Sequence, residues 1–122
     1  MKNLIELEDA TRQWSQDRGI LTNGKLPTQA LKLVSEVGEL ADNVGKNNLE
    51  ALKDDIGDCL VVLTNLSYLA GTTLEECWNE AYNDIKDRVG FLNENGNFIK
   101  NTDSNYDELY AKFLESEESK NK

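Results

Sequence analysis

Two pairs of acidic residues are the part of this sequence best suited to chemistry. Glu36 and Glu39 form an E-x-x-E pair in SEVGELAD, and Asp55 and Asp58 form a D-x-x-D pair in DDIGDCL. Residues three apart share one face of a helix and lie about 4.5 Å apart along its axis. Carboxylates are rarely buried unless they are paired or bind a metal. Four of them on neighbouring helices therefore indicate a site for a hard divalent cation, Mg²⁺ or alternatively Mn²⁺.

Both pairs lie in segments whose apolar residues recur at helical spacing. We predict helices over residues 3–18, 27–44, 47–70 and 73–88, with Pro27 in a first turn and Gly45 just after a last one. Asn47 and Thr73, each followed by Glu three residues later, predict capping boxes. The Asn95-Gly96 turn predicts a small hairpin, residues 106–114 a short helix, and the last eight residues disorder.

The third predicted helix is the most apolar part of the chain. Leu49, Leu52, Ile56, Leu60 and Leu63 form its main stripe, and residues 59–63 are apolar all round, so this half should be covered on every side. The sequence thus predicts an all-α helical bundle of about four helices, completed by oligomerisation, with a small C-terminal hairpin. We assign residues 1–100 to this domain and 101–122 to a polar, acidic C-terminal tail.

Composition excludes several classes of function. The formal net charge is −10, which disfavours nucleic acid and anionic membranes as partners. The chain has no histidine, which excludes a His general base and His-containing zinc sites. Cys59 and Cys77 lack the spacing of a metal or disulfide motif. The N-terminus lacks the apolar core of a signal peptide, so we expect a soluble cytoplasmic protein.

A solvated helix face is the usual explanation for one acidic pair, but the surroundings here favour a shared site. One polar stripe holds Lys32, Glu36, Glu39 and Asn43, and a second, interrupted by Val62, holds Asp55, Asp58 and Asn65. Asp58 directly precedes the apolar run. The connection between the two helices is short, so they should be antiparallel neighbours whose acidic stripes face each other.

SEVGELAD followed by DDIGDCLVVLTNL resembles the MazG family of all-α nucleoside triphosphate pyrophosphohydrolases, whose signature is E-x-x-E and then E-x-x-D. AYNDIKDRVG is also similar to the closing segment of that family, and the likeness covers roughly residues 10–90. The resemblance implies that the four acids bind the metal. This sequence departs from the family signature at Asp55, where Glu is usual.

The resemblance further implies a reaction and roles. Mg²⁺ ions would bridge the phosphates, and water would attack the α-phosphorus of a (d)NTP, giving (d)NMP and pyrophosphate for nucleotide pool housekeeping. Glu36 or Glu39 would be the general base. The implied assembly is a homodimer or homotetramer. Candidate substrate-binding residues are Lys32, Asn83, Lys86 and Arg88, with Trp14 as the more favoured of two tryptophans for stacking on the base.

Two other functions stay open. The Asp at position 55 is compatible with a catalytically weakened regulator that binds nucleotide or metal without turnover. The acidic surface is also compatible with a pure interaction protein, for which metal should have no specific effect.

Overall fold

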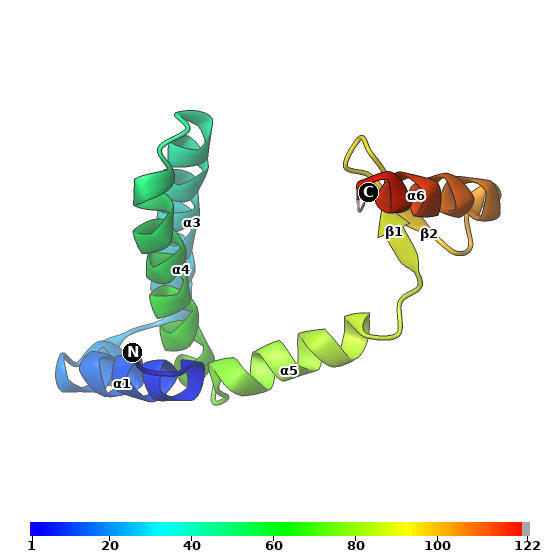
Figure 1. Ribbon diagram of the computed structural model, residues 1–122. Coiled ribbons are helices and arrows are strands. Elements are labelled where there is room, and N and C mark those ends of the chain that lie inside the picture. The colour runs from blue at the N-terminus through cyan, green and yellow to red at the C-terminus, as the bar shows by residue number, and fades with distance from the viewer. Residues whose placement is uncertain (121–122) are drawn as a thin grey trace. The chain divides into compact units, whose positions relative to one another are not determined.

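A computed structural model of the chain describes residues 1–120 and consists of six helices and one two-stranded sheet (Figure 1). The all-α fold class is confirmed, and so is the small C-terminal hairpin. The elements are α1 (Leu4–Asp17), α2 (Ile20–Asn23), α3 (Leu26–Gly45), α4 (Leu49–Leu69), α5 (Leu74–Ile85), β1 (Gly90–Leu92), β2 (Phe98–Lys100) and α6 (Tyr106–Lys120).

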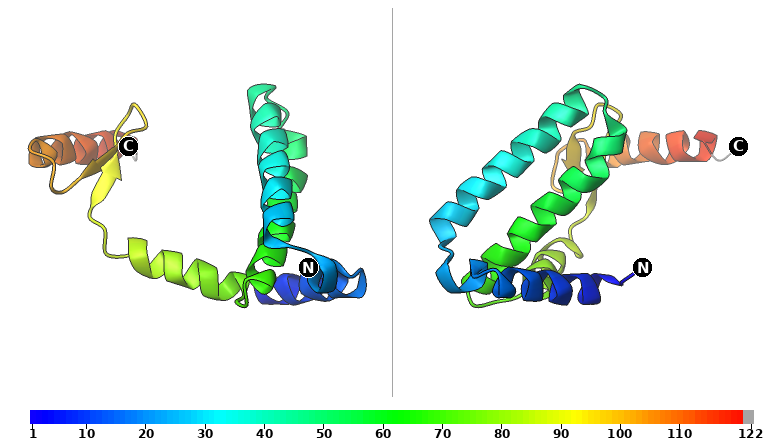
Figure 2. Two further views of the ribbon diagram at one scale, coloured as in Figure 1. Left: turned by 180° about the vertical axis from the view of Figure 1, so that it is seen from behind. Right: turned by 90° about the vertical axis from the view of Figure 1, so that its left-hand side faces the viewer.

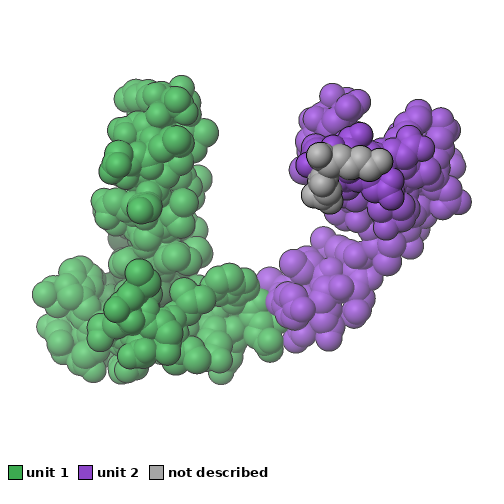
Figure 3. All heavy atoms as spheres, in the orientation of Figure 1, with its two compact units in different colours: residues 1–80 green, residues 81–122 purple. Residues whose placement is uncertain are grey.

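The chain divides into two compact units, Met1–Glu80 and Ala81–Lys122, which Figure 3 shows in different colours. The first unit holds α1 to α4 and the start of α5. The second holds the end of α5, the hairpin and α6. The division of the chain into a domain over 1–100 and a tail over 101–122 stays a prediction.

An antiparallel helical hairpin, α3 and α4, forms the centre of the first unit (Figure 2). Pro27 lies in the first turn of α3, as predicted. The connection differs in detail from the prediction, because Gly45 is still helical and Asn47 takes the left-handed conformation with φ 56°. The amide of Asn48 then donates to the carbonyl of Asn43 (2.9 Å), which ends α3 with a Schellman-type turn.

The predicted capping boxes fare differently. Asn47 opens no helix: α4 begins after Asn48, whose side chain accepts no capping hydrogen bond. The hydroxyl of Thr73 does accept from the amide of Glu76 (3.1 Å) at the start of α5. A complete capping box stands instead at α1, where Asn3 and Glu6 each accept a hydrogen bond from the backbone amide of the other.

Polar contacts connect the helices of the first unit. The fully buried Ser15 hydroxyl of α1 donates to Oδ1 of Asn65 on α4 (2.6 Å). Asn65 in turn donates to Oε1 of Gln29 on α3 (3.4 Å). Three residues further along α4, the Tyr68 hydroxyl donates to Glu8 (2.9 Å), whose second oxygen accepts from the amide of Glu75 at the start of α5 (2.8 Å).

The second unit is organised around Phe91. This ring is buried on β1 and stacks on Phe113 of α6, with ring centroids 4.9 Å apart. The hairpin turn is where the sequence predicts it, with Gly96 at φ 83°. The prediction of disorder after residue 114 was wrong for residues 115–120, which continue α6, and residues 121–122 lie outside the described part.

Hydrophobic burial is sparse. Val62 and Phe91 are the hydrophobic residues with a buried side chain in the described part of the chain. Leu60 and Leu63, which the sequence placed in a fully covered segment, are exposed in the single chain. Within residues 1–120, no helix has the length and apolar character needed to cross a membrane.

Candidate functional site

The α3–α4 hairpin carries all four predicted metal ligands. Asp55 on α4 is buried, with 7% of its surface exposed. Glu36 on α3 retains 12% of its side-chain exposure. Asp58 is half-buried, whereas Glu39 is exposed. Three of the four carboxylates are therefore at least partly removed from solvent.

The pKa of Asp58 shows which charges surround it. Burial raises this pKa above its ordinary value, and the negative charges of Asp54, Glu36 and Asp55 raise it further. Lys32 acts in the opposite direction. Because Glu36 and Lys32 belong to α3 and Asp58 to α4, these charges interact across the hairpin, as the acidic stripes predicted. Glu39 is not among the groups that affect Asp58.

The neighbouring thiol is subject to the same field. Burial raises the pKa of Cys59, and the carboxylates of Glu36, Asp58 and Asp55 raise it further. Cys59 is a free, half-buried thiol. A thiol held in its neutral form is a poor nucleophile and a poor metal ligand, so Cys59 acts here as a small hydrophobic side chain.

Two polar contacts hold individual carboxylates. Lys32 Nζ lies 3.2 Å from Oε1 of Glu36, one turn further along α3. Asn43 Nδ2 donates to Oδ2 of Asp55 across the hairpin (2.7 Å). Polar stripes on both helices predicted that these residues would share a surface, but the Asn43–Asp55 contact itself was not predicted.

The donor set fits Mg²⁺ in its chemistry, because it consists of carboxylate oxygens on a partly desolvated surface. Within residues 1–120, no three carboxylates or thiols approach closely enough to hold one ion between them. Mg²⁺ does not need such a cage, since proteins usually bind it through one or two carboxylates together with waters and substrate phosphates. The repulsion that raises the pKa of Asp58 is what a bound cation would relieve.

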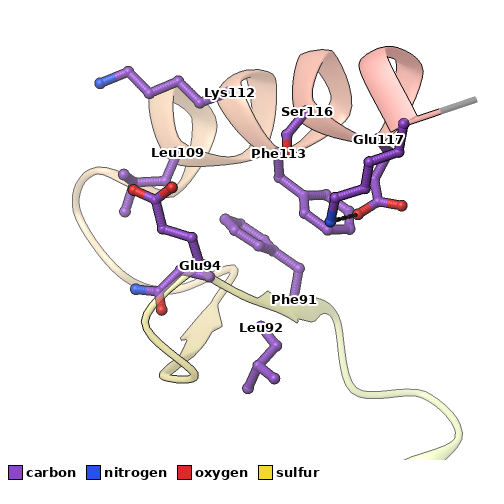
Figure 4. A pocket seen from close by; sticks show the side chains of 10 residues that line it. Phe91, Leu92, Glu94, Leu109, Lys112, Phe113, Ser116 and Glu117 are labelled. Carbon is purple, nitrogen blue, oxygen red and sulfur yellow. Dashed lines mark hydrogen bonds and ion pairs between the residues drawn. The ribbon is translucent and has the colours of Figure 1, made fainter. Parts of the chain in front are cut away.

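A groove in the second unit contains none of the predicted site residues (Figure 4). It measures about 550 Å³ and lies between β1 and α6. Phe91 and Phe113 are among its lining residues, and their rings lie between the strand and the helix. At its rim, Lys120 contacts Glu117 (3.5 Å), so the charges at this end of the groove are already paired.

Comparison with known proteins assigns the hairpin to a family. Residues 26–89 match the MazG nucleotide pyrophosphohydrolase domain, which is more than half of the chain. The chain belongs to the MazG family. The match begins at the start of α3 and takes in all four acidic positions, so the MazG domain here includes α3, α4 and α5.

One curated relative is similar in sequence but has no assigned function. An uncharacterised 18.2 kDa protein from the rep-hol intergenic region of Haemophilus phage HP1 is 39% identical over 67 residues. The aligned part is 55% of this chain and 41% of the relative, so the chain matches less than half of that protein's length. No solved structure matches the chain significantly.

The substrate-binding residues that the MazG resemblance implies lie in different places. Lys32 belongs to the hairpin, while Asn83, Lys86 and Arg88 are exposed and belong to the second unit. α5 ends at Ile85, so Lys86 and Arg88 follow the helix instead of lying on it as predicted. Trp14 on α1 is 46% exposed, and the Arg18 guanidinium lies over its ring, 4.3 Å from the ring centroid.

Proposed function

We propose that this MazG-family protein is a Mg²⁺-dependent nucleoside triphosphate pyrophosphohydrolase that cleaves (d)NTP to (d)NMP and pyrophosphate in nucleotide pool housekeeping. Its partners would be nucleoside triphosphates and further copies of the chain, with no role for nucleic acid or membrane. The observation that supports this best is the partly desolvated carboxylate surface of the MazG hairpin: Asp55 is buried, Glu36 is 12% exposed, and burial together with neighbouring carboxylates from both helices raises the pKa of Asp58.

A polyanionic substrate explains why this surface needs a cation. The triphosphate would be repelled by Glu36, Asp55 and Asp58 at neutral pH. Bound Mg²⁺ would neutralise phosphate charge and lower the pKa of a water molecule. The chain thereby uses its acidic residues to recruit the substrate, although its net charge of −10 would otherwise keep nucleotides away.

The reaction we propose is attack of water on the α-phosphorus. A bond forms between the water oxygen and this phosphorus, and the bond to the oxygen bridging the α- and β-phosphorus breaks. The proton of the water passes to Glu36 or Glu39, and pyrophosphate leaves with the bridging oxygen. Lys32 is ion-paired with Glu36, which orients that carboxylate and offsets its charge.

Cationic side chains would balance the charge of the leaving pyrophosphate. Lys86 and Arg88 are candidates by family resemblance, and both are exposed and accessible to a ligand. Asn83 could bind phosphate through its amide. We propose that the nucleobase of the substrate stacks on Trp14, because the Arg18 guanidinium lies over the indole ring and the residue is nearly half exposed.

The exposed apolar surface supports self-association. Leu31 and Val34 on α3 are 72% and 68% exposed, and Ile56, Leu60 and Leu63 on α4 are exposed as well. Monomeric soluble proteins seldom leave so many large apolar side chains on two adjacent helices uncovered. We therefore propose that a second copy of the chain covers them, in a homodimer or homotetramer.

Product analysis tests the proposed reaction. The protein is incubated with each dNTP and NTP and Mg²⁺ or Mn²⁺, and the products are separated. Glu39→Gln should abolish monophosphate and pyrophosphate formation. Asp42→Asn is the matched control, because Asp42 is an exposed acid on α3 that pairs with Lys46 (2.7 Å), and its loss should leave turnover unchanged.

The second candidate is a regulator that binds nucleotide without hydrolysing it. Asp55 favours it, because Glu is usual at this position and the shorter carboxylate is already engaged by Asn43. Nucleotide-dependent stabilisation without turnover would support this function. Turnover that appears only in Asp55→Glu would support it further.

A further inference from the structure

The carboxylate of Asp55 is held by a side chain that lies outside the E-x-x-E and D-x-x-D pairs. Asn43 Nδ2 on α3 donates to Asp55 Oδ2 on α4 over 2.7 Å. An ionised carboxylate can only accept hydrogen bonds, so the amide must turn its NH₂ group toward it. Asp55 is 7% exposed, so solvent offers little replacement for this donor.

We propose that Asn43 is a positioning residue that orients Asp55 for cation binding, an inference that rests on the proposed function. Asp has one methylene fewer than the Glu expected here, so its carboxylate stays closer to α4. The contact from Asn43 occupies Oδ2 and fixes the rotation of the carboxylate. Oδ1, to which the structure of residues 1–120 shows no hydrogen bond, is left for the cation.

The place of Asn43 in the fold supports this role. It follows Glu36 by seven residues and Glu39 by four, so all three share one stripe of α3. The backbone at Asn43 is also fixed, because its carbonyl accepts the hydrogen bond from Asn48 that closes the end of α3 (2.9 Å). A fixed backbone and a charge-assisted hydrogen bond give Asp55 one preferred orientation.

The competing explanation is that the contact only joins α3 to α4. Stability alone would not separate the two, since both predict that loss of Asn43 destabilises the fold. Magnesium affinity separates them, because a merely structural contact would not alter the affinity of a variant that still folds.

The test is calorimetric titration of Mg²⁺ into nucleotide-free protein, with thermal unfolding recorded in parallel. Asn43→Ala should weaken Mg²⁺ binding roughly tenfold or more, the scale on which residues that orient metal ligands act. Asn48→Ala is the matched control, because its side chain makes no capping hydrogen bond, and its affinity should equal that of the parent.

A second variant keeps the proposal testable if Asn43→Ala does not fold. Asn43→Ser keeps a small polar side chain on α3 and leaves the Asp55 carboxylate in place, but its hydroxyl is too short to make the same contact with Oδ2. It should fold and still bind Mg²⁺ more weakly than the parent. Parent-like affinity in either variant would overturn the positioning role without touching the proposed function. A parent that binds no Mg²⁺ in this titration would overturn the positioning role, while nucleotide turnover decides the proposed function separately.

Discussion

We expect the charge of Asp58 to oppose folding in the absence of a cation. Its pKa is raised in the folded chain, so the folded state holds the proton more tightly than the unfolded state. The free energy of unfolding should then fall as pH rises from the ordinary aspartate pKa through the raised one. Asp58→Asn removes this loss and should raise the unfolding midpoint at pH 7 by roughly 2–5 °C without Mg²⁺.

Magnesium should reduce or reverse the stability advantage of Asp58→Asn over the parent. The parent should gain stability from Mg²⁺ because a ligand of the native state stabilises it, whereas Asp58→Asn should gain less. Thermal unfolding with and without Mg²⁺, with KCl at matched ionic strength, measures both effects. A lower midpoint for Asp58→Asn in the absence of Mg²⁺ would show that its charge does not oppose folding.

Tyr68 gives a second pH dependence, at the alkaline end. Burial and the hydrogen bond to Glu8 raise its pKa from 10.0 to about 12. Its contribution to stability is therefore complete below pH 10 and is lost as pH rises toward 12, because the unfolded chain ionises first. Two pKa units correspond to about 2.7 kcal/mol, and solvent screening at this partly exposed hydroxyl should make the loss smaller. Urea unfolding of Tyr68→Phe should show a smaller decrease over this range, and an identical decrease in both proteins would refute the assignment.

At the scale of single residues, the sequence identified the acids but not their supporting partners. Type and spacing sufficed to place Glu36, Asp55 and Asp58 on facing helices. The contacts of Asn43 with Asp55, and of Ser15 with Asn65, join residues 12 and 50 positions apart. Such pairs depend on the exact rotation of two helices about their axes, which a periodic pattern does not determine.

The connection between α3 and α4 is the element that sets how the acidic stripes meet. Asn47 occupies the left-handed conformation there, which costs little for Asn and Gly and about 1 kcal/mol or more for other residues. Asn47→Ala should therefore lower the free energy of unfolding by about 1 kcal/mol, while Asn48→Ala changes it by less than about half as much. Chemical denaturation of both variants checks this, and equal losses would contradict it.

Helix ends were the least predictable feature of the elements. Gly45 and Asn47 both fit the residue after a helix, and the sequence favoured the glycine, but α3 continues through Gly45 to a turn closed at Asn48. Tertiary packing of the α3–α4 hairpin outweighs the local preference of glycine for the position after a helix. The helicity of residues 115–120 was missed because composition, not the aromatic contacts of α6 with Phe91, guided the prediction.

For the whole molecule, the sequence predicted a helical bundle completed by oligomerisation, and this assembly stays a prediction. One hydrophobic residue of the first unit, Val62, is buried, and the apolar stripe with Leu31 and Val34 is exposed. The parent should therefore be a dimer or tetramer at micromolar concentration by light scattering. Val34→Lys should lower the molecular mass of the assembly, because a buried unpaired charge disfavours association. Thr28→Lys is the control, since it changes an exposed polar position on the same helix and should leave that mass unchanged. A monomeric parent would contradict the proposed assembly.

Isotope labelling of the products tests the central claim most directly. Each nucleoside triphosphate is turned over in H₂¹⁸O with Mg²⁺, and the products are weighed by mass spectrometry. Attack on the α-phosphorus predicts one ¹⁸O in the nucleoside monophosphate and none in the released pyrophosphate. Label in pyrophosphate, release of diphosphate with inorganic phosphate, or no turnover with any nucleotide would contradict the assignment of this MazG hairpin as a pyrophosphohydrolase site.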